Sequence, residues 1–319
     1  MEENRTEILV TGGAGFIGSH LIEQLLKNNY KVTVIDNFDT FYSKEIKLKN
    51  ISGVINNPYL KVIDIDILNI ADLYARLTDQ YEVIVHLAAK AGVRPSIEDP
   101  IAYQDVNVKG SQNMLEFARH KNIKQFIFAS SSSVHGTNKN FPWKESDVAL
   151  NPISPYASTK ISGELLGHVY SHLFGIRFIA LRFFTVFGPG QRPDLAIHQS
   201  SKKILNSEAI NLLGNGSTRR DYTYVADTVK GIFNAIQYTR TPFEVFNLGN
   251  HHTISLSEMI HTLETVFNKK VIIKHLPEQM GDVPITYADI SKAEQLLNYV
   301  PKTNFKQGIT KFKNWLETK

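Results

Sequence analysis

Short apolar runs alternate with segments of helical spacing through the first 190 residues of the chain. The run from Ile8 to Thr11 is typical of a buried strand in a parallel sheet. After it, Leu21, Ile22 and Leu25 recur at the spacing of one helix face. Such alternation predicts βαβ units and a doubly wound parallel sheet of the α/β class. The expected strands are 7–11, 31–36, 60–65, 83–88, 124–130 and 176–182, and the expected helices lie near 16–28, 69–79, 100–120 and 155–174.

Capping residues mark where several of these helices begin. Asp99 and Ser154 each stand directly before a proline, which favours the first turn of a helix. Further along, Ser255 with Glu258 and Ser291 with Glu294 have the spacing of capping boxes. We therefore expect helices to begin at all four places.

After about residue 187 the alternation becomes less regular, with turn-rich segments at 188–193 and 213–217. We expect residues 1–187 to form the sheet domain and residues 188–319 to form mainly a smaller C-terminal α/β lobe that closes over the carboxyl edge of the sheet. Interleaving of the two parts is the alternative. The elements expected in the second part are strands near 209–213, 244–248 and 271–275, and helices near 194–206, 225–238, 255–267, 289–298 and 305–317.

A glycine-rich turn separates the first expected strand from the first helix. Gly12, Gly15 and Gly18, with Phe16 and Ile17 between them, allow a tight turn and close approach of the backbone to a pyrophosphate. The exposed N–H groups of the helix start favour a phosphate. The spacing is G-x-x-G-x-x-G, so a glycine turn without a ligand is the alternative.

A carboxylate after the second expected strand favours the nucleotide interpretation. Asp36 lies 18 residues after Gly18, close to the about 20 expected for a carboxylate that binds the ribose of a dinucleotide. It should accept hydrogen bonds from the ribose hydroxyls, with Asn37 beside it, and repel a 2′-phosphate. The sequence therefore predicts a Rossmann-type domain that binds NAD rather than NADP.

Composition narrows the function classes. The chain has 319 residues, a formal charge of +4 and no cysteine, which excludes thiolate chemistry. The basic residues are scattered, and the densest cluster, Lys44, Lys47 and Lys49, is expected to be a solvated helix face rather than a nucleic-acid site. No apolar run approaches the roughly 20 residues that span a bilayer, and the acidic first residues do not resemble a secretory signal. We expect a cytoplasmic protein without nucleic-acid or membrane partners.

Tyr156 and Lys160 are the strongest catalytic candidates. Four residues apart on a helix, they face the same side. A lysine ammonium beside the phenol, together with an oxidised nicotinamide, favours the phenolate, which could take a proton from a sugar hydroxyl. The preceding expected strand ends in the serine run 130–133, at the edge where a nicotinamide should lie. A metal site is not expected, because His168 and His172 lack the glutamate of an H-E-x-x-H motif.

These motifs resemble the extended short-chain dehydrogenase/reductase family and, within it, the nucleotide-sugar epimerases. The resemblance runs from the first strand to well inside the second lobe. The stretches that carry it are 12–18, 86–89, 105–110, the serine run, 156–160, 181–188 and 219–227.

The resemblance implies roles for individual residues. Ser131, Tyr156 and Lys160 match the catalytic triad of the family. The matching cofactor positions, beyond the glycine loop and Asp36, are Asp66 and Ile67 beside the adenine, Leu87, Ala88 and Ala89 at the central groups, and Asn107 near the nicotinamide. Arg220 matches an arginine that binds the nucleotide diphosphate, although an ion pair with Asp221 is the alternative, and Asp282 matches a uridine-ribose contact. Arg94 and Leu213 are further expected substrate contacts.

The serine run bears on the reaction. Related dehydratases and decarboxylases carry a carboxylate where this chain has Ser131, Ser132 and Ser133. Its absence favours epimerisation, in which a transient ketone turns over and receives the same hydride on its other face. NAD would then stay tightly bound and would not be consumed.

The stretches 182–194 and 91–97 resemble UDP-glucuronate 4-epimerases more than the galactose enzymes. An enzyme acting on a uronate must hold the carboxylate away from the geometry for decarboxylation. We expect Thr185, Ser132 and Ser133 to donate hydrogen bonds to it, with Arg192 as a charge partner or gate. The alternatives are a UDP-glucose or UDP-N-acetylglucosamine 4-epimerase, a UDP-glucuronate decarboxylase and a non-catalytic NAD-binding sensor.

Two further expectations follow from the resemblance. His135 stands where the family usually has tyrosine, and a histidine there could titrate near neutral pH; we expect a structural role or one that supports the site residues. The family also suggests a homodimer built from the helices near 100–120 and 155–174.

Overall fold

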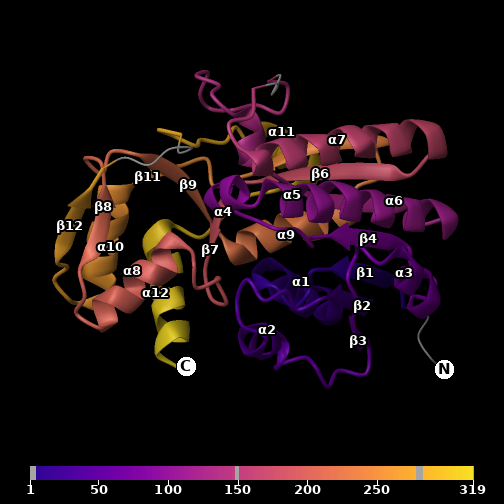
Figure 1. Ribbon diagram of the computed structural model, residues 1–319, viewed down its shortest axis with the longest axis horizontal. Coiled ribbons are helices and arrows are strands. Elements are labelled where there is room, and N and C mark those ends of the chain that lie inside the picture. The colour runs from indigo at the N-terminus through magenta and orange to yellow at the C-terminus, as the bar shows by residue number, and fades with distance from the viewer. Residues whose placement is uncertain (1–4, 148–150, 278–282, 319) are drawn as a thin grey trace.

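A computed structural model describes residues 5–147, 151–277 and 283–318 of the chain (Figure 1). Its centre is a parallel sheet of seven strands in the order β10-β6-β5-β4-β1-β2-β3. This confirms the predicted Rossmann-type doubly wound sheet. The strands are β1 (Glu7–Thr11), β2 (Lys31–Asp36), β3 (Leu60–Asp64), β4 (Val83–His86), β5 (Gln125–Ser131), β6 (Arg177–Phe183) and β10 (Phe243–Leu248).

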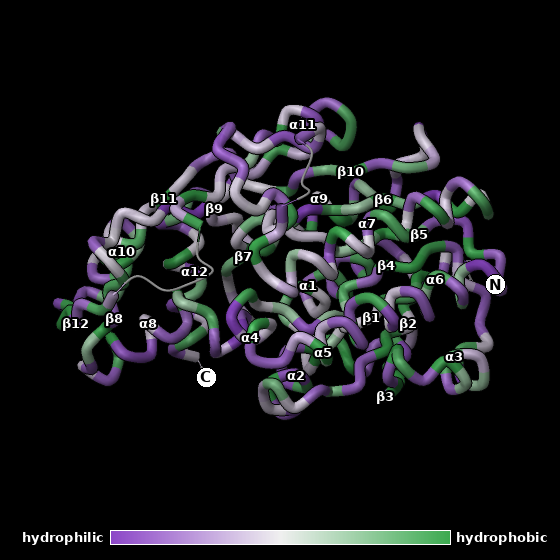
Figure 2. The backbone as a smooth tube through the Cα atoms, turned by 45° about the horizontal axis from the view of Figure 1, so that its top comes forward, coloured by the Kyte–Doolittle hydropathy of each residue, from purple (hydrophilic) through white to green (hydrophobic). Residues whose placement is uncertain are grey.

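The central strands are buried on both faces because their side chains alternate between two apolar layers. Ile8 and Val10 of β1 pack in one cluster with Leu21 of α1, whereas Leu9 packs in a second cluster with Leu115 of α6. Figure 2 shows the hydrophobic positions concentrated along these strands. The first layer contains α1 (Phe16–Lys27) and α9 (Val225–Ile236), and the second contains α3 (Ile70–Arg76), α6 (Gly110–His120) and α7 (Pro155–Phe174).

One expected strand lies in a different place from the prediction. The segment near 244–248, expected in the C-terminal lobe, is β10, which pairs in parallel with β6 at the edge of the main sheet. Likewise α9 packs against α1 rather than within the second lobe. The chain therefore leaves the main sheet after β6 and returns to it before completing the second lobe.

The second lobe is built from short strands and helices (Figure 1). Three strands that the hydrophobic pattern did not predict form a sheet in the order β11-β9-β7, and two predicted ones form a parallel pair. The strands are β7 (Thr185–Phe187), β8 (Ile210–Leu213), β9 (Arg219–Tyr224), β11 (Thr253–Ser255) and β12 (Ile273–Leu276). The helices of this part are α8 (Ala196–Leu205), α10 (Leu256–Phe267) and α12 (Phe305–Glu317), whereas α11 (Ser291–Leu297) packs against β10 and α9.

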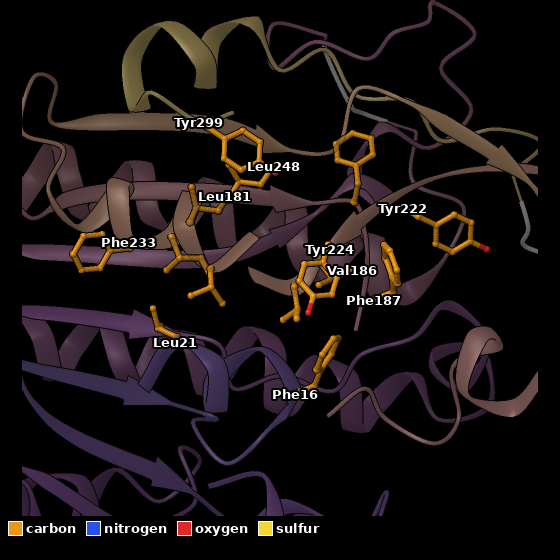
Figure 3. Close-up of a cluster of buried hydrophobic side chains, with 14 of the residues drawn as sticks. Phe16, Leu21, Leu181, Val186, Phe187, Tyr222, Tyr224, Phe233, Leu248 and Tyr299 are labelled. Carbon is orange, nitrogen blue, oxygen red and sulfur yellow. The ribbon is translucent and has the colours of Figure 1, made fainter. Parts of the chain in front are cut away.

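An aromatic cluster joins the two lobes. The ring of Phe187 lies 5.8 Å from that of Tyr224 and 5.1 Å from that of Phe305, measured between centroids. Figure 3 shows Phe16 of α1 beside this group, close to Val186. Such large rings contribute much of the buried apolar area, so the first helix of the sheet domain and the second lobe share one core.

The helix starts agree with three of the four expected caps. The side chains of Asp99, Ser154 and Ser255 accept from backbone N–H groups of their helices, and Ser255 forms a full capping box with Glu258. A helix also begins at Ser291 as predicted, but the capping box expected there was wrong, because Ile290 is the N-cap of α11 and no side-chain cap forms.

The helix expected over 100–120 is not continuous. It comprises α5 (Pro100–Tyr103), a π-helical segment (Gln104–Lys109) and α6. Two further short helical segments were not predicted, namely α4 (Val93–Glu98) and a 3-10 turn (Ser132–His135), whereas α2 (Lys44–Ile51) is the helix expected to carry the lysine cluster. No helix within the three described ranges has the length and apolarity needed to cross a membrane.

Candidate active site

A cavity of about 660 Å³ lies at the carboxyl edge of the main sheet and extends toward the second lobe. It is lined by the loops after β1, β2, β4 and β5 and by the segment 183–195. Most of the predicted site residues meet on its wall. These are Gly12, Gly15, Phe16, Ile17, Gly18, Asp36, Asn37, Asp66, Ile67, Leu87, Ala88, Ala89, Ser131, Ser132, Ser133, Tyr156, Lys160, Thr185 and Arg192.

The glycine loop is shaped to receive a pyrophosphate. A Cβ at Gly12, where φ is +67°, would come within 2.8 Å of the backbone nitrogen of Ala88, and one at Gly18 would come within 2.5 Å of the Gly12 oxygen. Helix α1 begins after Gly15 without any side-chain cap, so its first N–H groups remain available for an anion. These features fit the diphosphate of NAD.

The adenosine end of the cavity holds a buried ion pair that the sequence did not predict. The Lys47 ammonium lies 3.3 Å from Asp36 Oδ1, and both side chains are buried. Asp36 also accepts from the backbone N–H of Ala14 and of Phe38, at 3.2 and 2.9 Å. The expectation that Lys47 lies on a solvated helix face was therefore wrong: α2 turns this residue inward, while Lys44 and Lys49 stay exposed.

Neighbouring loops complete this end. The Asn37 amide donates to Asp66 Oδ2 at 2.9 Å, and Ile67 is buried next to it. After β4, the backbone N–H of Ala88 donates to Thr11 Oγ1 at 3.0 Å, which fixes the loop that carries Leu87 and Ala89. The polar Asn37 and Asp66 and the apolar Ile67 together suit an adenine ring and its ribose.

The catalytic candidates meet where β5 and α7 lie side by side. The Lys160 ammonium donates to the carbonyl oxygen of Ala129 at 2.8 Å and lies 5.8 Å from the centre of the Tyr156 ring. Ser131 Oγ donates to Ser133 Oγ at 3.0 Å and accepts from the Ser133 N–H at 3.1 Å. The nucleophilic and basic groups thus lie on adjacent elements of the cavity wall.

Burial dominates the pKa values of this pair. It raises the pKa of Tyr156, while the hydrogen bond from Ser131 and the charge of Arg192 lower it. Burial also lowers the pKa of Lys160 to about 7, opposed by the charge of Glu164. The expected lowering of the Tyr156 pKa was therefore wrong as a net effect: burial raises this pKa, and the groups that act in the lowering direction are Ser131 and Arg192 rather than Lys160.

Asn107 supports the catalytic helix from outside the cavity. It lies in the π-helical segment and is buried. Its amide donates to the Lys90 carbonyl at 2.9 Å and to Thr159 Oγ1 at 3.0 Å, and it accepts from the Lys90 N–H at 2.8 Å. Asn107 therefore links the loop after β4 to α7.

Hydroxyl groups and one guanidinium also line the cavity. They belong to Ser132, Ser133, Thr185 and Arg192. Arg192 forms a two-point ion pair with Asp194, at 3.0 and 2.8 Å, and stacks over the Phe41 ring at 5.2 Å. The guanidinium is thus held in place by residues of the same loop and of the sheet domain.

Three predicted substrate contacts do not belong to this wall, and a fourth is not described. Arg94 lies in α4, Leu213 ends β8, and Arg220 lies in β9, where it donates to the Arg219 carbonyl at 2.8 Å. None of these three lines the cavity. Asp282 lies outside the described residues.

Sequence reasoning missed Tyr103, which lies directly beside Tyr156. The two rings meet edge to face with centroids 6.3 Å apart, and the Tyr103 hydroxyl donates to the Ala91 carbonyl at 3.1 Å. Burial raises the pKa of Tyr103 to about 12, so it stays a neutral donor. Tyr103 lies two residues before the 105–110 motif, and this position is the signal that could have identified it.

His135 is part of the core beneath the site. Its ring stacks on Trp143 at 4.9 Å and lies near Phe184. Burial lowers its pKa to about 3, with the charge of Arg182 acting in the same direction. Titration near neutral pH is therefore not a property of this histidine, and its role is structural.

Comparison with known proteins agrees with this geometry. Residues 8–249 match the model of the NAD dependent epimerase/dehydratase family. The chain belongs to that family.

Three relatives are similar over nearly their full length. The protein MJ1055 of Methanocaldococcus jannaschii is 46% identical over 98% of this chain and 97% of its own. The UDP-glucuronate 4-epimerase of Thermodesulfobacterium geofontis is 36% identical over 96% of this chain and 95% of its own. The crystal structure of UDP-glucuronic acid 4-epimerase from Bacillus cereus, in complex with UDP-glucuronic acid and NAD, is 37% identical with a TM-score of 0.91, over 98% of this chain and 99% of that one.

Proposed function

We propose that this protein is an NAD-dependent isomerase that converts UDP-glucuronate to UDP-galacturonate by epimerisation at C4. The observation that carries the proposal is the set of polar side chains on the cavity wall near Tyr156. Three hydroxyl side chains and Arg192 line the cavity beside Tyr156, and the serine run carries no carboxylate. The similarity to two UDP-glucuronate 4-epimerases supports the same substrate.

The proposed chemistry assigns each group a step. Tyr156 takes the proton of the C4 hydroxyl, Ser131 holds the oxygen, and Lys160 supplies a positive charge beside the phenol when its ammonium is protonated. NAD, when bound, accepts the C4 hydride and returns it. After the ketone turns over, the same tyrosine gives the proton back on the other face of the sugar.

The carboxylate of the substrate needs its own receptor. Oxidation at C4 creates a β-keto acid, which loses carbon dioxide when the carboxylate stands perpendicular to the ketone. Hydrogen bonds from Ser132, Ser133 and Thr185 would hold it in another orientation. Arg192 would supply the countercharge with its N–H groups that do not bind Asp194.

The nucleotide and the second subunit complete the proposal. The second lobe, with Arg220 and Leu213, would hold the UDP part together with Arg94 of α4, and the sheet domain would hold NAD. A homodimer is supported by an exposed apolar stripe on α7, Leu165, Val169 and Leu173, beside Ile97 and Ile101. Single exposed apolar residues are ordinary, but a stripe at intervals of four is typical of an interface.

The decisive experiment is to incubate the purified protein with UDP-glucuronate and no added cofactor, and to resolve the products by ion-exchange chromatography and proton NMR. UDP-galacturonate is the expected product and would also establish that NAD is retained. Formation of UDP-xylose or a 4-keto pentose would mean that the substrate loses its carboxylate, and would contradict the proposed role of the carboxylate receptor. Turnover of UDP-glucose or UDP-N-acetylglucosamine alone would establish a neutral-sugar epimerase instead.

The proposed carboxylate receptor predicts that loss of Arg192 affects a uronate substrate more than a neutral sugar. Arg192→Ala should reduce kcat/KM for UDP-glucuronate by about 100-fold, since one charged hydrogen-bond partner is lost, and should affect UDP-glucose far less. Asp194→Asn, which weakens the attachment of Arg192 but keeps its guanidinium, should reduce this kcat/KM less than Arg192→Ala does. Equal losses of Arg192→Ala on both sugars would contradict a role in carboxylate binding.

A further inference from the structure

A second buried charged group lies directly behind the catalytic pair. Tyr156, Lys160 and Glu164 follow at intervals of four along α7 and so share one helix face. The Glu164 carboxylate receives two parallel hydrogen bonds from Arg182 of β6, from Nε and Nη2 at 2.9 Å each. It also accepts a hydrogen bond from Ser130. All of these side chains are buried or nearly so.

These bonds attach the end of β5 to α7 at consecutive residues. Lys160 donates to the carbonyl of Ala129, and Ser130 donates to Glu164. The next residue is Ser131, whose hydroxyl faces Tyr156 and lowers its pKa. A displacement of Glu164 would therefore move the strand end that presents Ser131.

The ion pair of Glu164 and Arg182 also determines the net charge next to Lys160. A two-point arginine–carboxylate pair is strong and geometrically specific, and in a dry interior an uncompensated charge acts over several ångströms. With both partners present, the Glu164 and Arg182 charges largely cancel. Removing one of them leaves the other uncompensated near Lys160 and Tyr156.

Few other charged or titratable groups face this region. His86 on β4 feels the charge of Lys160 but stays neutral, because burial lowers its pKa to about 3. Tyr103 on α5 and Arg192 on the loop after β7 face Tyr156. On the far side, His135 and Glu145 face Arg182, whose Nη1 donates to the Glu145 carbonyl at 3.4 Å.

We propose that Glu164 and Arg182 are positioning residues of the catalytic centre: their ion pair fixes Ser131 against Tyr156 and balances the charge behind Lys160. The inference deepens the proposed function and rests on the catalytic roles of Tyr156 and Lys160. Tyr156→Phe therefore accompanies every test, because residual turnover in that variant would refute those roles rather than the role of the ion pair.

The test is the pH profile of kcat/KM, with whichever UDP-sugar the wild type turns over. In Glu164→Gln the Arg182 cation is uncompensated and favours the phenolate, so the acidic limb should move down by about one pH unit. In Arg182→Gln the Glu164 anion is uncompensated, so the limb should move up. Ser130→Ala keeps both charges and should lower kcat without moving the limb.

The double variant Glu164→Gln/Arg182→Gln separates charge from structure. It removes both charges, so its limb should return to the wild-type position. If one single variant does not fold, the other single variant and the double variant still decide the question. An unshifted limb in a folded single variant, or equal shifts in the single and double variants, would overturn the inference while Tyr156→Phe remained inactive.

Discussion

Lys47 forms a buried ion pair in the cofactor site that its sequence position did not predict. Its ammonium neutralises Asp36 within a buried wall. We expect Lys47→Met to weaken NAD binding about 10-fold, because the carboxylate loses its partner where a ribose must bind. The measurement is the NAD that remains bound after gel filtration and the Kd from calorimetry. Lys49→Met, on the exposed side of the same helix, is the control and should retain NAD as the wild type does.

His135 gives a prediction about acid stability. Its pKa is lowered from 6.5 to about 3 by burial, so the unfolded chain binds the proton more readily. Stability is therefore lost as pH falls below 6.5, and the loss grows until about pH 3. Between pH 7 and 5, the unfolding free energy of the wild type should fall by about 2 kcal/mol more than that of His135→Phe.

Chemical denaturation at several pH values checks this prediction, since every other titrating group is common to both proteins. Parallel curves for the wild type and His135→Phe would mean that His135 is protonated in the folded state without cost.

The sequence predicted the site residues correctly where their spacing along the chain alone determines that they lie together. The glycine loop, Tyr156 with Lys160, and the serine run all depend on neighbours within one turn or one loop. It could not predict that Lys47 turns inward or that Arg192 pairs with Asp194. Those contacts depend on how α2 and the 188–194 segment meet in space.

Helix α7 lies close to the sheet because it carries two glycines on its inner face. A Cβ at Gly167 would come within 2.2 Å of the Phe178 ring. Overpacking costs about 1–3 kcal/mol, and the helix propensity of alanine offsets about 1 kcal/mol. Because the overlap is severe, Gly167→Ala should lower the unfolding free energy by about 2 kcal/mol.

Urea unfolding of Gly167→Ala measures the effect. Gly53→Ala is the control, since nothing lies within 4 Å of a Cβ there, and it should be neutral. Unchanged stability of Gly167→Ala would mean that α7 can move away from β6 without loss.

Helices and strands were predictable where apolar residues recur at the spacing of one helix face or form a short buried run. Such patterns are present in six strands of the main sheet and in α1, α7, α9, α10 and α12, and their predicted ranges agree with the structure to within about two residues. The strand β9 was missed because its sequence, RRDYTY, begins with three charged residues, of which Asp221 is buried and both arginines are partly exposed. The π-helical segment 104–109 was missed because the apolar positions continue through it.

The apolar stripe on α7 makes a prediction for the whole molecule. If two subunits meet there, Leu165→Glu combined with Leu173→Glu should convert a dimer to a monomer, because buried unpaired charges oppose association. Sedimentation velocity measures the change. Val300→Glu, an equally exposed apolar position elsewhere, should leave the assembly intact, and a monomeric wild type would contradict the proposed dimer.

The return of the chain to the main sheet has a consequence for synthesis. Strand β6 has no partner on its outer side until β10, which ends at Leu248, has left the ribosome. Until then its backbone groups are open to other chains, and the inner face of α1 waits for α9. Residues 175–242, many of which belong to a different lobe, separate the catalytic helix from the strand that completes the sheet. The nascent protein thus carries most of its active-site residues before it can hold them in place.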